Sequence, residues 1–298
     1  MEPQVSSDDK TGSTSCEMQH LPSALVIRQL RGLDLVGYKL RLKLRSLRER
    51  RPKSFTPNVF LLDNTRLVKH SRLGGTVRLT EAIAMDYISK NTTIPVPRVH
   101  EVLGVDGSIH IVQEYIDGDL LDNVWHKLTS DEQRSSMEQL KGYLAQLQVL
   151  TPPHPGRVEA IDGSGCLDAR LHSGQWGPFD NVEEFNRFFG HEYVREYPDL
   201  YPKAEEPLAK TYRRTWRTAF AHGDIGPHNI IWKNGKIVAI IDWECSGWFP
   251  EYWDYTRAYF GAVAPSRWSW WKMFRESMAG YPDELAVEIA LATYFIRI

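Results

Sequence analysis

The chain of 298 residues is close to electrically neutral, with 36 lysines and arginines against 38 aspartates and glutamates and a formal net charge of −2. Hydrophobic residues make up 42% and charged residues 25%, proportions typical of a globular protein. This balance gives no indication of nucleic acid as a partner, since polyanion-binding proteins carry an excess of basic residues. The three cysteines, Cys16, Cys166 and Cys245, lie far apart, which argues against a disulfide framework or a zinc cluster.

The sequence shows neither an export signal nor a membrane-spanning segment. Its first twenty residues are polar, and no run of eighteen apolar residues occurs. We therefore expect a soluble cytoplasmic protein with no membrane partner, and the sequence indicates no oligomeric state. Residues 1–20 are rich in Ser, Asp and Thr and are predicted to form a disordered tail.

A helical extension is predicted over residues 21–53, with its helix at 24–51. The second half of this helix is rich in basic residues, namely Arg41, Lys43, Arg45, Arg48, Arg50 and Arg51. The helix could contact an anionic surface, or its basic residues could form a solvated face. We favour the solvated face, because single basic helices are common and the overall charge is balanced.

Residues 54–116 carry most of the predicted strands. Turn residues such as Asp106-Gly107 separate short apolar runs, a pattern typical of β-hairpins. The predicted elements are a hairpin of strands 59–62 and 66–70, a helix over 76–90, and a hairpin of strands 99–103 and 109–116.

Helical patterns dominate residues 117–298. The predicted elements are helices over 130–150, 181–197 and 203–219 and a strand pair within 230–243. A small strand-rich part followed by a larger helical part predicts an α+β fold with two lobes, 54–116 and 117–298, and a cleft between them.

The strand pair supplies the most informative geometry. Asn234-Gly235 between two apolar runs is a strong signal for a two-residue hairpin turn. The register predicted from that turn is Lys233 with Lys236, Trp232 with Ile237, Ile231 with Val238 and Ile230 with Ala239. Asn229 then lies opposite Ile240, and strand alternation places Asp242 on the same face as Asn229. An amide and a carboxylate converging in this way can bind one hard cation.

Asp224 lies five residues before Asn229, in a loop that His222 is predicted to brace. Phosphoryl transfer needs one carboxylate to orient and deprotonate an acceptor hydroxyl while an Asn and a second Asp hold Mg²⁺. The spacing of Asp224, Asn229 and Asp242 matches those roles. A lone H-x-D-x-x-x-x-N pattern also arises by chance, and the hairpin makes the functional interpretation more specific.

Two segments carry a resemblance to a known family. HGDIGPHNIIW at 222–232 and IVAIIDWECSGWFPEYWDY at 237–255 resemble the aminoglycoside phosphotransferase family, and GPFDNVEEFNRFF at 177–189 resembles its fungal branch. The resemblance implies a two-lobed protein-kinase-like fold with ATP in the cleft between the lobes. It also implies a Mg²⁺-dependent transfer of phosphate to a hydroxyl group, which we expect to belong to a small molecule.

The resemblance also assigns roles to single residues. It makes Asp224 the catalytic base, and Asn229 and Asp242 the magnesium ligands. Lys69 in LVKH matches the strand lysine that binds phosphates, and Glu81 in RLTEAIAMDYI matches the helix glutamate that pairs with it. Taken without the downstream segment, Lys69 and Glu81 would read as solvated positions on a strand and a helix.

The segment HIVQEYIDGDLL at 110–121 resembles the linker between the lobes. In the family this linker binds the adenine edge through its backbone, which points to the backbone groups near Glu114 and Ile116. A plain strand followed by a turn would give the same pattern.

The pattern departs from the family before the first hairpin, where Lys53–Asn58 contains no glycine to cradle phosphates. Residues 288–298 read as a helix in which the chain stops, so the last helices of the larger lobe are expected to be short or missing. These departures leave an alternative function, a kinase-fold nucleotide-binding or scaffold protein without turnover. The retained residues at the catalytic positions favour the enzyme.

Two further groups of residues have competing interpretations. An aminoglycoside-binding surface would need acidic side chains, for which the candidates are Glu251, Asp254, Glu276, Asp283 and Glu284. The tryptophans of the C-terminal part could stack on a ligand, but core packing is the more common role. They are Trp243, Trp248, Trp253, Trp268, Trp270 and Trp271.

Overall fold

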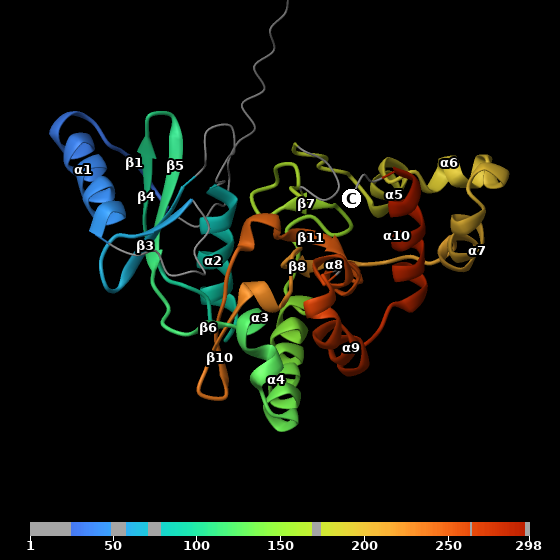
Figure 1. Cartoon of the computed structure of the whole chain (residues 1–298). Helices are drawn as coiled ribbons and strands as arrows, with labels where there is room; N and C mark the ends of the chain where they lie inside the picture. Colours follow the sequence, from blue (N-terminus) through green and yellow to red (C-terminus); the bar gives the residue numbers. More distant parts are fainter. Residues whose placement is uncertain (1–24, 49–57, 71–78, 169–173, 263, 296–298) are drawn as a thin grey trace, which may run out of the picture.

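The computed structural model describes residues 25–48, 58–70, 79–168, 174–262 and 264–295 (Figure 1). The predicted tail over residues 1–20 and most of the glycine-free stretch Lys53–Asn58 lie outside these residues. None of the described helices combines the length and the apolar character needed to cross a lipid bilayer.

A five-stranded sheet in the order β1-β4-β5-β3-β2 forms the N-terminal part. Its strands are β1 (Ile27–Gln29), β2 (Val59–Leu61), β3 (Arg66–His70), β4 (Val99–Val105) and β5 (Ser108–Glu114). Both predicted hairpins are confirmed, since β2 pairs with β3 and β4 with β5, each antiparallel. The predicted helix after β3 is α2 (Leu79–Asn91).

The helix predicted over 24–51 is wrong at its start. Residues Ile27–Gln29 form β1, which pairs in parallel with β4, and α1 begins only at Gly32 (Gly32–Arg48). The edge of β4 offers backbone partners that no local pattern reveals, and this pairing overrides helix propensity. Leu35 and Leu42 then pack α1 against the core of the sheet.

Eight helices and six strands of the C-terminal part are described after residue 116. The helices are α3 (Leu121–Val124), α4 (Ser130–Gln148), α5 (Val182–Phe188), α6 (His191–Glu196), α7 (Pro202–Thr211), α8 (Trp253–Gly261), α9 (Trp268–Ser277) and α10 (Pro282–Phe295). The strands are β6 (Asp119–Leu120), β7 (Glu159–Ala160), β8 (Thr218–Ala221), β9 (Ile230–Lys233), β10 (Lys236–Ile240) and β11 (Gly247–Pro250). They form two three-stranded sheets, β10-β9-β6 and β7-β11-β8.

Two predicted helices of this part are wrong in extent. The helix predicted over 181–197 breaks into α5 and α6 at Gly190, whose φ of 83° suits glycine and no regular helix. The helix predicted over 203–219 ends at Thr211, because the fully buried strand β8 pairs with β11.

The register predicted for the β9–β10 hairpin is correct only next to its turn. Lys233 pairs with Lys236 and Trp232 with Ile237 as expected, but a bulge at Val238 then shifts the pairing by one residue. The shifted pairs are Ile231 with Ala239 and Ile230 with Ile240. A bulge bends its strand and re-aims the residues beyond it.

Aromatic side chains fill the core of the C-terminal part, as predicted. Five of the six tryptophans considered above are at most 1% exposed, namely Trp243, Trp248, Trp253, Trp270 and Trp271. Trp268 differs, with 52% of its surface exposed. One of these buried rings, Trp243, contacts His222 in the loop between β8 and β9, with the ring centroids 4.5 Å apart.

Candidate active site

The loop between β8 and β9 is braced by a buried histidine. The ring of His222 is fully buried, its Nε2 lies 3.0 Å from the Ile241 carbonyl oxygen, and its Nδ1 accepts the Asp224 N–H at 3.2 Å. These two contacts need one donor and one acceptor nitrogen, which is the neutral ring with its proton on Nε2. Burial also lowers the pKa of His222. The predicted bracing role of His222 is confirmed.

Asp254 supports the same loop through hydrogen bonds to its backbone. Its carboxylate accepts the backbone N–H groups of His222 at 3.1 Å and Gly223 at 2.8 Å, and it is 5% exposed. Its suggested place on an acceptor-binding surface is therefore wrong. Gly223 has a φ of 80°, and a Cβ atom there would lie 2.3 Å from the Cys245 carbonyl oxygen. Only glycine fits this approach of two backbone segments.

Asp224 and Asn229 lie in direct contact at the end of the loop. The Asn229 side-chain amide donates to the Asp224 backbone carbonyl at 2.8 Å and to Asp224 Oδ2 at 3.1 Å. Asn229 is 3% exposed, whereas the Asp224 side chain is 25% exposed. The loop therefore fixes an amide in the interior and leaves a carboxylate that solvent can reach.

The second group of charges surrounds the ammonium of Lys69, on β3. Its Nζ lies 2.9 Å from Glu81 Oε2, 2.5 Å from Asp242 Oδ1 and 3.5 Å from Glu244 Oε2. Burial works to lower the pKa of Lys69, but the three carboxylates outweigh it and raise that pKa well above its usual value. These contacts favour the charged form of Lys69 and join the N-terminal sheet to the segment after β10.

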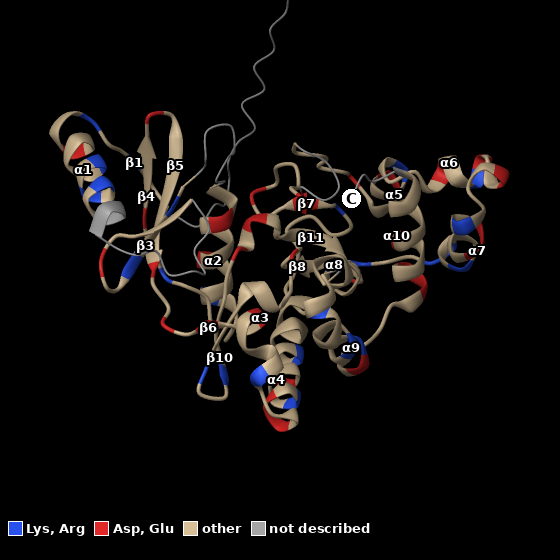
Figure 2. Cartoon of the chain, in the orientation of Figure 1, with Lys and Arg blue, Asp and Glu red and all other residues tan. Residues whose placement is uncertain are grey.

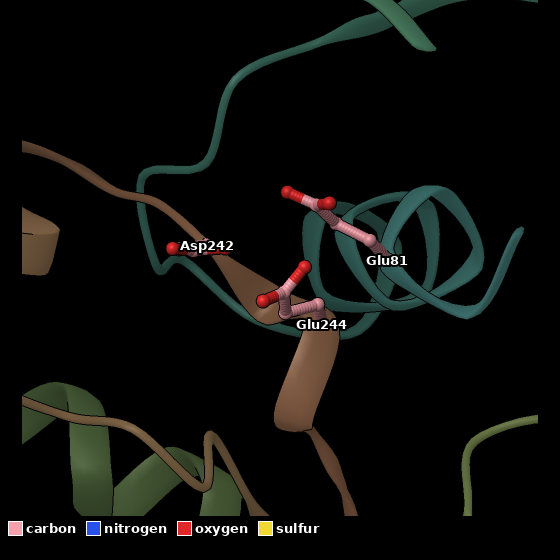
Figure 3. A group of neighbouring side chains, drawn as sticks. All are labelled: Glu81, Asp242 and Glu244. Carbon is pink, nitrogen blue, oxygen red and sulfur yellow. The ribbon is translucent and has the colours of Figure 1, made fainter. Parts of the chain in front are cut away.

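Three carboxylates converge around this one cation. Oxygen atoms of Glu81, Asp242 and Glu244 lie within 4.8 Å of one another (Figure 3). Burial raises the pKa of both Glu81 and Glu244. When all three are ionised, one ammonium faces three negative charges, and the excess favours a divalent cation with a preference for oxygen ligands.

Glu244 was missed in the analysis of the sequence. Its only local signal is its position two residues after Asp242, in the segment DWE. A turn of 3₁₀ helix over Trp243–Cys245 brings its carboxylate back beside Asp242. Asp242 itself has a left-handed backbone, with φ 67° and ψ 55°, after β10 has ended at Ile240. Strand alternation is therefore not what directs the Asp242 side chain, contrary to the prediction.

Of the two predicted linker residues, Glu114 is the last residue of β5 and Ile116 follows two residues later. The N–H groups of Glu114 and Tyr115 donate to the carbonyls of Arg98 and Thr65, at 2.9 and 2.8 Å. Among the backbone hydrogen bonds of the described residues, none involves the Ile116 N–H. The linker then enters β6, which pairs with β9 and so connects it to the hairpin of the site.

The remaining acidic candidates for an acceptor surface are mostly paired with arginines. Glu251 lies 2.8 Å from Arg217, and Arg214 binds Asp283 at 2.6 Å and Glu284 at 2.7 Å. A cavity of about 610 Å³ between α5, α6 and α10 includes Glu284 in its lining. None of the predicted catalytic, metal-binding or nucleotide-binding residues lines that cavity.

A comparison with known families decides what kind of protein carries this arrangement. The model of the phosphotransferase enzyme family, APH, matches residues 49–280. The chain belongs to this family. It is therefore a phosphotransferase, as the sequence predicted. No curated protein matches its sequence.

Solved structures resemble the phosphotransferase over most of its length. The streptomycin–ATP–APH(2'')-IIa ternary complex has a TM-score of 0.53 and 15% identity, covering 88% of this chain and 89% of that one. The gentamicin–APH(2'')-IIa complex has a TM-score of 0.52 and 14% identity, covering 89% and 87%. The apo form of a thermostable mutant of aminoglycoside phosphotransferase APH(4)-Ia has a TM-score of 0.51 and 13% identity, covering 78% and 83%. This likeness confirms the two-lobed, kinase-like α+β fold.

Proposed function

We propose that this phosphotransferase moves the γ-phosphoryl group of ATP to a hydroxyl group of a small molecule, with Mg²⁺ as its cofactor. The observation that carries the proposal is the contact between Lys69 and Asp242, which are 173 residues apart in the chain. It places a cation from the N-terminal sheet and a carboxylate from the C-terminal part at one point. Charge of both signs is what the phosphates of a nucleotide and their metal ion require.

Similar proteins support the choice of substrates. The structural neighbours include a complex with streptomycin and ATP and a ternary complex of an APH(4)-Ia mutant with AMP-PNP and hygromycin B. We infer from them a nucleoside triphosphate as the donor and a hydroxylated small molecule as the acceptor.

Five side chains then have defined roles. Lys69 neutralises charge on the nucleotide phosphates, and Glu81, buried beside it, holds the lysine in place. Asp242 and Asn229 would hold Mg²⁺ through side-chain oxygen atoms, and the carboxylate of Glu244, which lies beside that of Asp242, would add a further oxygen ligand. When bound, the ion supplies positive charge to the phosphoryl group in transfer.

Asp224 is the proposed base for the transfer itself. Its carboxylate takes the proton of the acceptor hydroxyl as the hydroxyl oxygen bonds to the γ-phosphorus. The bond between the γ-phosphorus and the oxygen that bridges to the β-phosphate breaks, and ADP leaves with that oxygen. The contact with Asn229 orients the carboxylate for this step.

The linker supplies the proposed adenine contact. The Glu114 N–H already donates to Arg98, so we assign the donor for the adenine ring to the Ile116 N–H and the acceptor to the backbone near Glu114.

The test is the release of ADP from Mg²⁺–ATP in the presence of hydroxylated small molecules, beginning with aminoglycosides and simple polyols. Wild type should release ADP only when a suitable acceptor is present, and ³¹P NMR should find a phosphate ester on that acceptor. Failure to bind Mg²⁺–ATP at all would favour the alternative of a kinase-fold scaffold without turnover.

A further inference from the structure

Helix α1 has an apolar face that none of the described residues covers. Its inner face packs on the N-terminal sheet through Leu35, Tyr38 and Leu42. Four aliphatic residues lie on the opposite face at positions i, i+3, i+7 and i+11, which form one stripe along a helix. They are Leu33, Val36, Leu40 and Leu44, exposed by 89%, 61%, 53% and 47%. Arg41 and Lys43, which were predicted to lie on a solvated face, are exposed, but the stripe between the basic residues is apolar.

Basic residues accompany the stripe. The helix sequence contains Lys39, Arg41, Lys43, Arg45 and Arg48 against one acidic residue, Asp34. With 3.6 residues per turn, Lys39 and Lys43 lie on one flank of the stripe and Arg41 on the other. Lys39 is paired with Asp106 in the β4–β5 turn at 2.5 Å, which neutralises part of one flank. Figure 2 shows the blue positions along α1.

We propose that α1 docks the protein on an anionic lipid surface, with the stripe Leu33–Leu44 inserted at the level of the headgroups and the basic flanks against lipid phosphates. Helices that lie in a membrane interface combine an apolar face with flanking Lys and Arg. The inner face of α1 is fixed to the sheet, so the stripe can only face outward. In Figure 1, α1 lies at the outer edge of the N-terminal part, where a flat surface can reach it.

Charge argues for lipid over a second copy of the chain. Two copies meeting through this stripe would bring basic flanks against basic flanks, and like charges at such a contact are unfavourable. An anionic bilayer has the complementary charge, and it adapts to a convex helix without a matching groove. The expectation of no membrane partner rested on the lack of a membrane-spanning segment, which does not exclude a helix that lies on the membrane surface.

The experiment is flotation of the full chain with phosphatidylcholine vesicles, with and without phosphatidylserine. We expect wild type to bind the vesicles with phosphatidylserine several-fold better and to be released as salt is raised. The double substitution Val36→Glu and Leu40→Glu should lower binding at least about tenfold, and Arg41→Glu should lower it about tenfold. Leu200→Glu is the matched control, because Leu200 is 61% exposed in the C-terminal part, and it should bind as wild type does.

Thermal unfolding of each variant checks that its fold is retained, which we expect because all the substituted side chains are exposed. The proposal is overturned if wild type ignores phosphatidylserine or if the double variant still floats with the vesicles. It is also overturned if wild type is a dimer in solution that the double variant converts to a monomer, because a second copy then covers the stripe.

Discussion

The loop that carries Asp224 and the cluster around Lys69 hold their charges in different ways. In the loop, partners close in sequence or buried beneath it fix each group through hydrogen bonds, as His222 and Asp254 do. In the cluster, Lys69 contacts Asp242 through a hydrogen-bonded ion pair that joins two parts of the fold 173 residues apart in the chain. The position of the proposed base is thus set within one lobe, whereas the position of the proposed phosphate and metal site depends on both lobes.

The largest effect should come from removing the proposed base. Asp224→Asn keeps the size of the side chain but cannot take the acceptor proton, so turnover should fall roughly 10²–10⁴-fold. The affinity for Mg²⁺–ATP should change little, because the charges around Lys69 are untouched. Steady-state kinetics and a nucleotide titration measure the two quantities, and near-normal turnover would remove Asp224 from the mechanism.

The next largest effect should come from removing Asp254, which supports the loop that carries Asp224. Asp254→Ala leaves the buried N–H groups of His222 and Gly223 without an acceptor, at about 1–3 kcal/mol for each group. We expect the free energy of unfolding in urea to fall by roughly 2–4 kcal/mol. Asp283→Ala is the control, since its partly exposed ion pair with Arg214 should contribute at most about 1 kcal/mol. Equal losses in both variants would show that the loop does not rely on Asp254.

A substitution in the cluster around Lys69 should change the affinity for ATP more than the free energy of unfolding. Glu81→Gln removes a buried carboxylate that holds Lys69, while Asp242 and Glu244 still contact the ammonium. We expect about tenfold weaker ATP binding, since a hydrogen bond to a charged group contributes at least about 1.5 kcal/mol. Isothermal titration checks the affinity, and an unchanged dissociation constant would mean that Glu81 does not position the lysine.

The two regions should also differ in the sign of their pH dependence. Burial lowers the pKa of His222 from its ordinary 6.5, so below that value the unfolded chain binds a proton that the folded chain refuses. Burial raises the pKa of Glu81 from 4.5 to about 7, so between these values the folded chain keeps a proton that the unfolded chain releases. His222 should therefore lower the free energy of unfolding on acidification, and Glu81 should raise it from pH 7 to 4.5.

Variants separate the two contributions to the pH dependence. The stability of wild type relative to His222→Gln should shrink as pH falls below 6.5. Relative to Glu81→Gln it should grow as pH falls from 7 to 4.5. Urea unfolding across this range measures both differences, and two slopes of the same sign would contradict the environments assigned to these groups.

Local signals in the sequence were sufficient for the hairpins. Asn234-Gly235 and Asp106-Gly107 determine tight turns by their backbone preferences, and both turns occur where predicted. The bulge at Val238 was not predictable, because the apolar residues on either side of it fit either register. The family resemblance, and no spacing rule, connected Lys69 with the segment that carries Asp242.

Tertiary contacts account for the misses at the site. Asp254 has no distinguishing signal in the sequence. Only the fold shows that its carboxylate accepts a hydrogen bond from the backbone N–H of His222. Glu244 joins the cluster through the left-handed backbone of Asp242 and the turn that follows, neither of which has a local signature. Residues far apart in the chain become neighbours through packing, which periodicity and spacing do not encode.

The most direct test of the central claim is thermal unfolding with ATP, with and without Mg²⁺, in wild type, Asp242→Asn and Glu251→Gln. A ligand bound to the native state at a hundredfold excess over its dissociation constant raises stability by about 2.7 kcal/mol. We predict a Mg²⁺-dependent rise in wild type and in Glu251→Gln, whose carboxylate pairs with Arg217 outside the cluster, and its loss in Asp242→Asn. A rise of equal size in all three proteins would contradict the proposed metal and nucleotide site.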